Sequence, residues 1–383
     1  MYVDATAPAD IRTAVLTARE RGLRFAVYAT GHGGPAPTGE DTVVVDTSRM
    51  TGVLVDPERR TARVRPGTRW ADVIAAAAPF GLAPLSGTAP SVGVVGYTLG
   101  GGHGWLSRRF GFAADSVLRA RLVTADGELR TVSADRDPDL FWAIRGGGAN
   151  FGAVTELEFR LYPVRTVHAG VATFPIERAA ELLACYRDTA PTLPAELTAN
   201  IVLSKDSVAI RGMYVGPGVA ARRALAPLWQ VAGEPVTDGW RTMPYTESGT
   251  VGGTAPRQFT RHATLPDEVL TAAIDAVRGT ANAVEVRHWG GAMARPALDA
   301  GPIGDRDVPF SVAVDGACAT IAGHATGGSF LNWLADPAGT HSAYTAADLT
   351  WLRRIKADHD PTNLFGLAKN IAPAERHATS LGA

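Results

Sequence analysis

Residues 87–104 (GTAPSVGVVGYTLGGGHG) form a stretch that carries seven glycines and almost no charge. Glycine lets the backbone adopt positive φ and lets another molecule approach closely. Backbone N–H groups in such a segment can bind a pyrophosphate. The stretch therefore indicates a backbone that wraps a large, flat, partly apolar ligand with phosphates. The alternative is a packed loop in which the glycines only permit close contact.

His32 lies between glycines in a second such segment, residues 28–34 (YATGHGG), which follows a short predicted strand at 24–29. A strand that opens into a glycine-rich turn is the layout of a phosphate-binding loop. Prolines rather than a helical pattern follow this turn, so it is not a Rossmann dinucleotide fingerprint. The side chain of His32 either faces a ligand or is solvated in the turn. A third glycine-rich loop, residues 145–152 (RGGGANFG), precedes a predicted strand at 154–162, and three such loops are a stronger signal than one.

The composition limits the classes of function. The chain has 383 residues, of which 46% are hydrophobic and 20% charged, enough for two domains of ordinary size. A formal net charge of -1 and the lack of a Lys/Arg run give no sign of a nucleic-acid partner or of a membrane surface. No apolar run approaches membrane-spanning length and no signal peptide is visible, so we expect a soluble cytoplasmic protein. Cys185 and Cys318 are expected to be buried free thiols, and the nine histidines show no metal-ligand spacing.

The order of the predicted elements indicates an α+β fold. The glycine-rich loops end before about residue 165, and strands interleaved with helices then suggest a substrate-binding domain. The predicted helices span 7–22, 70–81, 140–144, 177–190, 219–231, 266–278 and 346–357. The predicted strands span 24–29, 42–46, 52–64 (a hairpin), 117–124, 129–133, 154–162, 171–174, 197–203, 208–215, 283–289 and 330–334, with 239–253 irregular.

Four segments, in this order, resemble the FAD-linked oxidases of the vanillyl-alcohol oxidase superfamily, above all the berberine-bridge-enzyme-like branch. They are YATGHGG (28–34), SGTAPSVGVVGYTLGGGHGWLSRRFG (86–111), DPDLFWAIRGGGANFGAVTELEFRLYPV (137–164) and IKADHDPTNLFGLAKNIAP (355–373). The resemblance implies a PCMH-type FAD-binding domain of two α+β subdomains, residues 1–164, completed by 345–383. It also implies a substrate domain, 165–344, whose antiparallel sheet is backed by helices and covers the flavin ring.

The same resemblance implies that FAD is joined covalently to His32 through the 8α-methyl carbon of the flavin. The chemistry suits this residue because a neutral imidazole nitrogen is a nucleophile near neutral pH. Many relatives add a cysteinyl bond at the position of Ala89, so a single bond is expected here. Val92 matches a site where valine accompanies oxygen reactivity, which favours an oxidase over a dehydrogenase. The positions that match the cofactor site are Ala29, Thr30, Gly31, His32, Gly33, Gly34, Gly87, Val92, Gly93, Gly96, Tyr97, Gly101, Gly102, Gly104, Gly152, Val154 and Asn370.

The resemblance leaves the catalytic base open. The family's usual tyrosine, near the start of the C-terminal helix, matches Leu349, so the remaining candidates are Tyr344, His103 and His288. His103 either acts on the substrate or packs under the cofactor. Arg287 and Trp289 share one strand face, with Glu285 as a partner for the arginine. The candidates for lining the pocket are Arg261, His262, His288, Trp289 and Tyr214, and Arg306 matches a structural arginine near the sheet edge.

These residues predict an FAD-dependent oxidase. A base removes a proton, hydride passes from a carbon of a small-molecule alcohol, sugar or natural product to the flavin, and O₂ restores the cofactor. One alternative is a flavin-binding cyclase or isomerase of secondary metabolism that carries out no redox reaction. Another is a degenerate binding protein, which the intact glycines of all three loops disfavour. The sequence leaves the substrate and the oligomeric state open.

Overall fold

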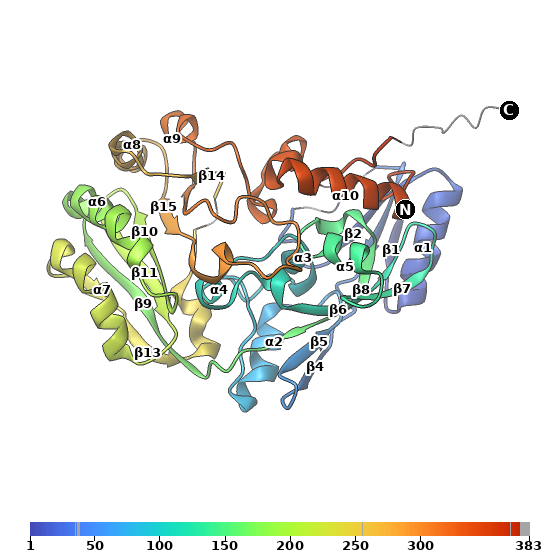
Figure 1. Ribbon diagram of the computed structural model, residues 1–383, viewed down its shortest axis with the longest axis horizontal. Helices are drawn as coiled ribbons and strands as arrows, with labels where there is room; N and C mark the ends of the chain where they lie inside the picture. The colour runs from blue at the N-terminus through green and yellow to red at the C-terminus, as the bar shows by residue number, and fades with distance from the viewer. Residues whose placement is uncertain (35, 37–38, 255, 368, 376–383) are drawn as a thin grey trace.

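The computed structural model describes residues 1–34, 36, 39–254, 256–367 and 369–375. Its first sheet places β3 (Thr42–Asp46) between β1 (Tyr2–Asp4) and β2 (Arg24–Tyr28), and both pairs are parallel. The helix α1 (Pro8–Glu20) packs on this sheet because its apolar residues recur at helical spacing and are buried. β2 runs directly into the loop that contains His32, so this small sheet fixes where that loop begins (Figure 1).

The second sheet of the first domain is antiparallel. Its order is β4 (Val53–Asp56), β5 (Thr61–Val64), β8 (Ala153–Arg160), β6 (Val117–Val123) and β7 (Leu129–Ser133). The helices beside it are α2 (Trp70–Ala77), α3 (Val94–Leu99), α4 (Ser107–Phe110) and α5 (Pro138–Ile144). From the end of the chain, α10 (Ala346–His359) returns to pack against α5. This return brings the C-terminal segment beside the third glycine-rich loop.

The second domain is built on an eight-stranded antiparallel sheet. The path runs β12 (Thr237–Asp238), β9 (Thr166–Pro175), β11 (Ser207–Tyr214), β10 (Leu197–Leu203), β15 (Val284–His288), β16 (Phe310–Val314) and β14 (Gln258–His262), and β13 (Arg241–Pro244) also pairs with β9. Its helices are α6 (Ala179–Thr189), α7 (Gly218–Ala232), α8 (Asp267–Arg278) and α9 (Ala319–Gly323). Figure 1 shows α6 and α7 on the outer side of this sheet, so its other face is turned toward the first domain.

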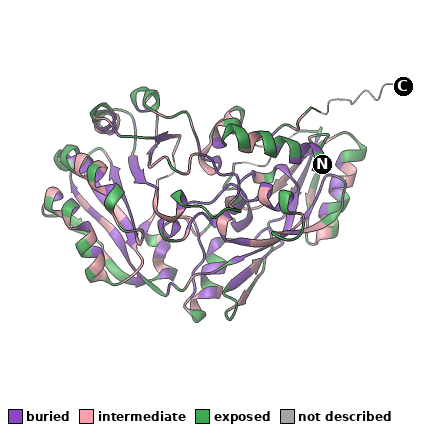
Figure 2. Ribbon diagram, in the orientation of Figure 1, coloured by how far each residue is buried: buried purple, intermediate pink, exposed green. Residues whose placement is uncertain are grey.

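Alternation along the strands explains this arrangement. Ile201, Ile210 and Val286 lie on the face that packs with α6, α7 and α8 and are almost fully buried. The neighbouring positions on each strand point to the opposite face, where several are polar or charged. Figure 2 shows the strands mostly buried and the outer surfaces of the helices exposed. A sheet with one apolar and one partly polar face therefore stands between the helices and the first domain.

Several predicted elements differ from the structure. The strand predicted at 330–334 is wrong, because this segment is the short 3₁₀ helix η8 (Leu331–Trp333). The segment 239–253 is not wholly irregular, since it contains β13 and the 3₁₀ helix η6 (Tyr245–Val251). β1, β14 and β16 were not predicted, and β9 begins at Thr166 rather than at residue 171. Short strands that are paired only with distant segments leave a weak local signal.

Arg306 joins the two domains. Its guanidinium donates to both carboxylate oxygens of Asp115, at 3.0 and 2.8 Å, and lies over the ring of Phe112. This forked contact fits the structural role expected for Arg306. Cys185 and Cys318 are free thiols as expected, but they are half-buried rather than buried. Within the described ranges, no helix is both long and apolar enough to cross a bilayer, and no cluster of His, Cys, Asp and Glu could hold a metal ion.

Candidate active site

The first two glycine-rich segments meet at His32. Its Nε2 lies 2.9 Å from Ser91 Oγ, and the side chain is exposed. The backbone N–H of Gly93 donates to Thr30 Oγ1 at 3.2 Å. The turn itself needs Gly31, whose φ is +80°. Residues that are about 60 positions apart in the sequence are thus held together by two hydrogen bonds.

The middle glycines pack around Tyr97 and Asn332. Gly102 has a φ of +76°, and its N–H donates to Asn332 Oδ1 at 2.9 Å. The Asn332 side chain also donates to the Tyr97 carbonyl at 3.1 Å, so it fixes the end of α3. Side-chain atoms on Gly87 or Gly102 would collide with the Tyr97 ring, at 2.9 and 2.5 Å. These glycines are required by protein packing as well as by any ligand.

The third loop is tied to the C-terminal segment through Asn150. The Asn150 side chain donates to the Lys369 carbonyl at 2.9 Å and accepts from the Ile371 N–H at 2.8 Å. The Lys356 ammonium donates to the Asn150 carbonyl at 2.7 Å and forms a fully buried ion pair with Asp360. Gly152, with φ +147°, directly precedes β8, which contains the buried Val154. Asn150 thus binds the residue before Asn370 and the residue after it, and these two contacts fix the position of Asn370.

The arrangement fits a large cofactor such as FAD. Gly33, Gly34 and Gly96 border open space, since a Cβ on any of them would meet no atom within 4 Å. Among the described residues, buried Asn370 Oδ1 and the Tyr97 hydroxyl have no hydrogen-bond partner. Unpaired buried polar atoms are uncommon and indicate a missing partner. Among the predicted cofactor positions, Gly33, Gly34 and Gly96 thus offer open backbone, and Tyr97 and Asn370 carry polar atoms without a partner.

His103 lies at the boundary between the domains. Its ring stacks on Trp289, with centroids 4.6 Å apart, and meets the edge of Trp333 at 5.3 Å. Burial lowers the pKa of His103 to about 3, assisted by the positive charges of Arg287 and Arg261. The ring is therefore neutral near pH 7, and it is a weak base. This geometry suits a side chain that orients a substrate by hydrogen bonding.

Tyr344 and His288 are poorly placed to act as the base. The Tyr344 hydroxyl donates to the Gly146 carbonyl at 3.1 Å, and burial raises its pKa well above the ordinary value. His288 Nδ1 accepts from Arg108 at 2.5 Å, and burial lowers the pKa of the ring to about 3. Leu349 lies on α10 and packs against the core of the first domain. The structure thus brings His103, Trp289 and Trp333 together and leaves Tyr344 and His288 in other environments.

Strand alternation separates the predicted pocket residues into two groups. Arg261, Arg287 and Trp289 lie on the face of the large sheet that is turned toward His103. Tyr214 packs against the core under the helices, so its expected place in the pocket is wrong. His262 alternates with Arg261 on β14 and is hydrogen-bonded to Thr260 at 2.8 Å. His262 therefore lies on the opposite side of its strand from the pocket, contrary to expectation.

Three buried histidines should make the protein sensitive to acid. Burial lowers the pKa values of His103, His288 and His262 to about 3, 3 and 4, from 6.5 in the unfolded chain. Below pH 6.5 the unfolded chain binds protons that the folded protein does not. The contribution of these histidines to the free energy of unfolding is therefore complete above pH 6.5 and is lost as the pH falls toward 4. Each histidine can contribute up to about 1.4 kcal/mol per pH unit. We expect the free energy of unfolding, measured with urea, to fall by ~3 kcal/mol or more between pH 7 and pH 5.

The His262→Gln variant should flatten this pH dependence by about 1 kcal/mol per unit. The exposed His341 provides a matched control, and His341→Gln should leave the slope unchanged. Equal slopes for the wild type and His262→Gln would contradict the assignment of this acid sensitivity to buried histidines.

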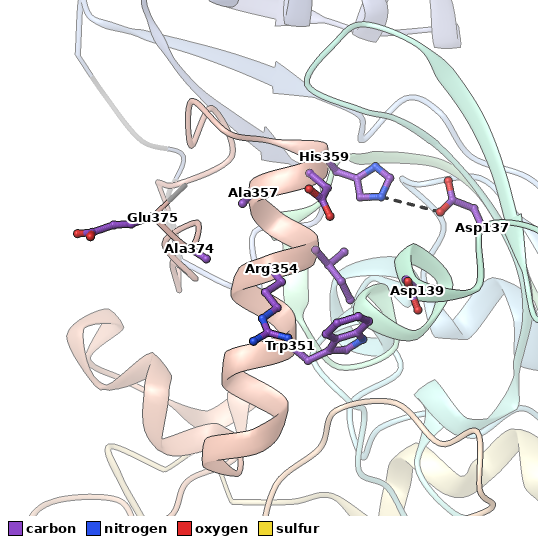
Figure 3. A pocket seen from close by; sticks show the side chains of 10 residues that line it. Asp137, Asp139, Trp351, Arg354, Ala357, His359, Ala374 and Glu375 are labelled. Carbon is purple, nitrogen blue, oxygen red and sulfur yellow. Dashed lines mark ion pairs between the residues drawn. The ribbon is translucent and has the colours of Figure 1, made fainter. Parts of the chain in front are cut away.

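A separate surface pocket of about 360 Å³ lies between α10 and the turn before α5. Asp137, Trp351, Arg354 and His359 are among its lining residues, and His359 forms a long ion pair with Asp137 at 3.9 Å (Figure 3). None of the residues predicted to bind the cofactor or the substrate lines this pocket. We therefore place the candidate active site at the glycine-rich loops and His103, not here.

Some site residues were not predicted from the sequence. Asn332 lies in the segment that was mistaken for a strand, and Ser91 and Asn150 gave no motif of their own. Arg211 and Asn200 are the other omissions, since they lie beside Arg287 and Glu285 on the large sheet. A usable signal did exist for Arg211, because a charged residue interrupts an otherwise apolar strand there. The predicted partnership of Arg287 with Glu285 is confirmed by an ion pair at 2.9 Å.

Comparison with known proteins gives a consistent result. The FAD binding domain family matches residues 1–133. A xylooligosaccharide oxidase of Thermothelomyces thermophilus is 30% identical over 428 residues, which covers 95% of this chain and 85% of that protein. An uncharacterized FAD-linked oxidoreductase of Bacillus subtilis is 28% identical over 372 residues, covering 87% and 82% of the two chains. The solved structure of a Physcomitrella patens BBE-like protein superimposes with a TM-score of 0.86 at 21% identity, covering 98% and 92% of the two chains.

Proposed function

This chain belongs to the berberine-bridge-enzyme-like FAD-linked oxidoreductases, and on that basis we propose that it holds FAD covalently on His32 and oxidises a small molecule with O₂ as the final acceptor. The enzyme is an FAD-dependent oxidoreductase. The single observation that supports the proposal most strongly is the convergence of three glycine-rich loops with the C-terminal segment. The comparisons do not favour the non-redox cyclase or isomerase, because the named relatives are oxidoreductases.

His32 is the proposed point of attachment. Its Nε2 is engaged by Ser91 Oγ, so we assign the bond to Nδ1. Formation of this bond would remove the one N–H hydrogen of the imidazole and one hydrogen of the 8α-methyl group, and O₂ would take up the two electrons and two protons as hydrogen peroxide. Ser91 would hold the imidazole in one orientation while the bond forms.

Different residues of the protein would bind the cofactor, orient the substrate and exclude water, according to where each lies. FAD, when bound, accepts the hydride that leaves the substrate carbon. Gly33, Gly34 and Gly96 would present backbone near the cofactor, and Asn370 Oδ1 would accept a hydrogen bond from it. His103 would orient the substrate hydroxyl, since its neutral ring can accept or donate one hydrogen bond. The aromatic rings of Trp289 and Trp333 would exclude water around the reacting carbon.

The first test is a spectrum and an intact mass of acid-precipitated wild-type protein, followed by oxygen consumption with a panel of alcohols and sugars. We expect a yellow pellet, a mass increased by one FAD, and one hydrogen peroxide per substrate oxidised. Native protein that stays colourless after FAD is supplied would refute the proposal. Turnover without oxygen consumption would instead support the cyclase or isomerase.

A further inference from the structure

Three arginines form a row across the face of the large sheet that is turned toward His103. The strand register places Arg211 opposite Asn200, Asn200 opposite Arg287, and Arg287 opposite Ser311. Ser311 in turn lies opposite Arg261. Residues that face one another across antiparallel strands project from the same side of the sheet. The row therefore concentrates positive charge on one line of the substrate side.

Among the described residues, the carboxylate of Glu285 faces this row, and its oxygens already accept three hydrogen bonds. Glu285 accepts from Asn200 Nδ2 at 2.7 Å, from the Thr254 N–H at 3.1 Å and from Arg287 Nη2 at 2.9 Å. Arg211 Nη1 is 3.6 Å from the same carboxylate, beyond hydrogen-bond distance. At the far end of the row, Arg261 donates to the carbonyls of Asp305 and Val308, and the charges of Asp305 and Asp307 act on it. Two arginines near the centre thus share one carboxylate, which leaves a surplus positive charge.

Hydrogen bonding in this row is incomplete. Arg287 Nε and both Nε and Nη1 of Arg211 are buried donors that find no acceptor within the described part of the chain. The acceptor Asn200 Oδ1 is likewise without a donor there. Arg287 itself is only 5% exposed. A buried donor without an acceptor destabilises the protein, because it has lost its hydrogen bonds to water. An anionic ligand with two oxygens would satisfy such donors and neutralise the surplus charge.

Aromatic side chains lie next to these donors. The Arg287 guanidinium is 4.7 Å from the centre of the Trp333 ring. Trp333 in turn lies 4.8 Å from Phe259 and 5.3 Å from His103, and both Trp333 and Phe259 are only half-buried. The partly exposed rings offer a flat apolar surface beside the cationic row. Their chemistry suits a ligand with a planar apolar body and a negatively charged end.

We propose that the substrate of this enzyme is a carboxylic acid with a planar, largely apolar body, whose carboxylate binds Arg287 with help from Arg211. The proposal rests on the proposed function, since it identifies the substrate class of the same site. The carboxylate would lie on the sheet of the second domain, and the apolar body against Trp333 and Phe259. The carbon to be oxidised would then extend toward His103 and the glycine-rich loops.

The test compares carboxylates with their neutral amides. Benzoate and benzamide, and 2-naphthoate and 2-naphthamide, are titrated into the purified protein by calorimetry at low ionic strength. We expect wild-type protein to bind each carboxylate at least about tenfold more tightly than its amide. Arg287→Gln should remove that preference, and Arg287→Lys should retain part of it because the charge is kept. Arg223, exposed on α7, supplies the matched control, and Arg223→Gln should leave the preference unchanged.

A second variant and a separate flavin spectrum complete the experiment. If Arg287→Gln does not fold, the double variant Glu285→Gln/Arg287→Gln removes opposite charges together and should lose the preference in the same way. Equal binding of acid and amide by the wild type, unchanged preference in the folded variants, or no saturable carboxylate binding would each overturn the proposal. The flavin spectrum of every sample is recorded separately. A preparation without flavin would count against the proposed function, whereas the calorimetric preference still judges the carboxylate site.

Discussion

His32→Ala is expected to abolish covalent flavin attachment completely. No other side chain of the described loops offers a nucleophilic nitrogen beside Ser91 Oγ, and Ala89 stands where a second, cysteinyl bond would form. The acid-precipitated variant should therefore be colourless, and its intact mass should equal that of the bare chain. The native variant should still be yellow when FAD is supplied, because the glycine-rich loops that would hold the cofactor are unchanged.

Oxidation by His32→Ala should also become dependent on added FAD, since affinity rather than a bond now retains the cofactor. His341→Ala, at an exposed histidine elsewhere in the chain, serves as the control and should keep its covalent flavin. A second comparison is Ser91→Ala, which should attach flavin more slowly because the imidazole is no longer oriented. If acid-precipitated His32→Ala remains yellow, attachment occurs at a different residue and the assignment of His32 is wrong.

The glycine-rich loops were predictable because glycine leaves a strong local signal. Positive φ at Gly31 and Gly102, and close approach at Gly104, depend on the absence of a Cβ at each position. The return of the C-terminal segment was predictable only through resemblance. Its physical basis, Asn150 bound to the Lys369 carbonyl and the Ile371 N–H, joins residues about 220 positions apart. No periodicity in the sequence encodes such a contact.

The face of the large sheet could not be predicted in the same way. Which arginines stand side by side depends on the register of four pairings among β11, β10, β15, β16 and β14. A shift of one residue in any of these pairings would move Arg211, Arg287 or Arg261 out of the row and toward the helix-covered side. β14 and β16 were not predicted at all, so Arg261 could be named as a candidate but not placed beside Arg287. The role of Asn332 could not be predicted for a related reason, because its short 3₁₀ helix is stabilised by tertiary contacts.

Gly104→Ala is expected to destabilise the fold severely. A Cβ at this position would lie 1.9 Å from the carbonyl oxygen of Ser86, which is part of the backbone and cannot rotate away. Relief requires the backbone at residues 86–87 or 102–104 to move, and overpacking of this kind costs at least about 3 kcal/mol. That loss is a large part of the ~5–15 kcal/mol by which a domain is stable. Urea unfolding should show it, and the purified variant should contain little flavin.

The same stretch allows the two interpretations of its glycines to be separated. Gly96 is exposed and a Cβ there would meet no atom within 4 Å, so Gly96→Ala should keep the fold but lower the flavin content if the cofactor approaches this backbone. Gly323→Ala, at the end of α9 and equally open, should change neither quantity beyond about 1 kcal/mol of stability. Normal flavin content in Gly96→Ala together with unfolding of Gly104→Ala would mean that the glycines of this stretch serve packing alone. Loss of flavin without loss of stability in Gly96→Ala would show that one segment serves both roles, with packing at Gly104 and ligand approach at Gly96.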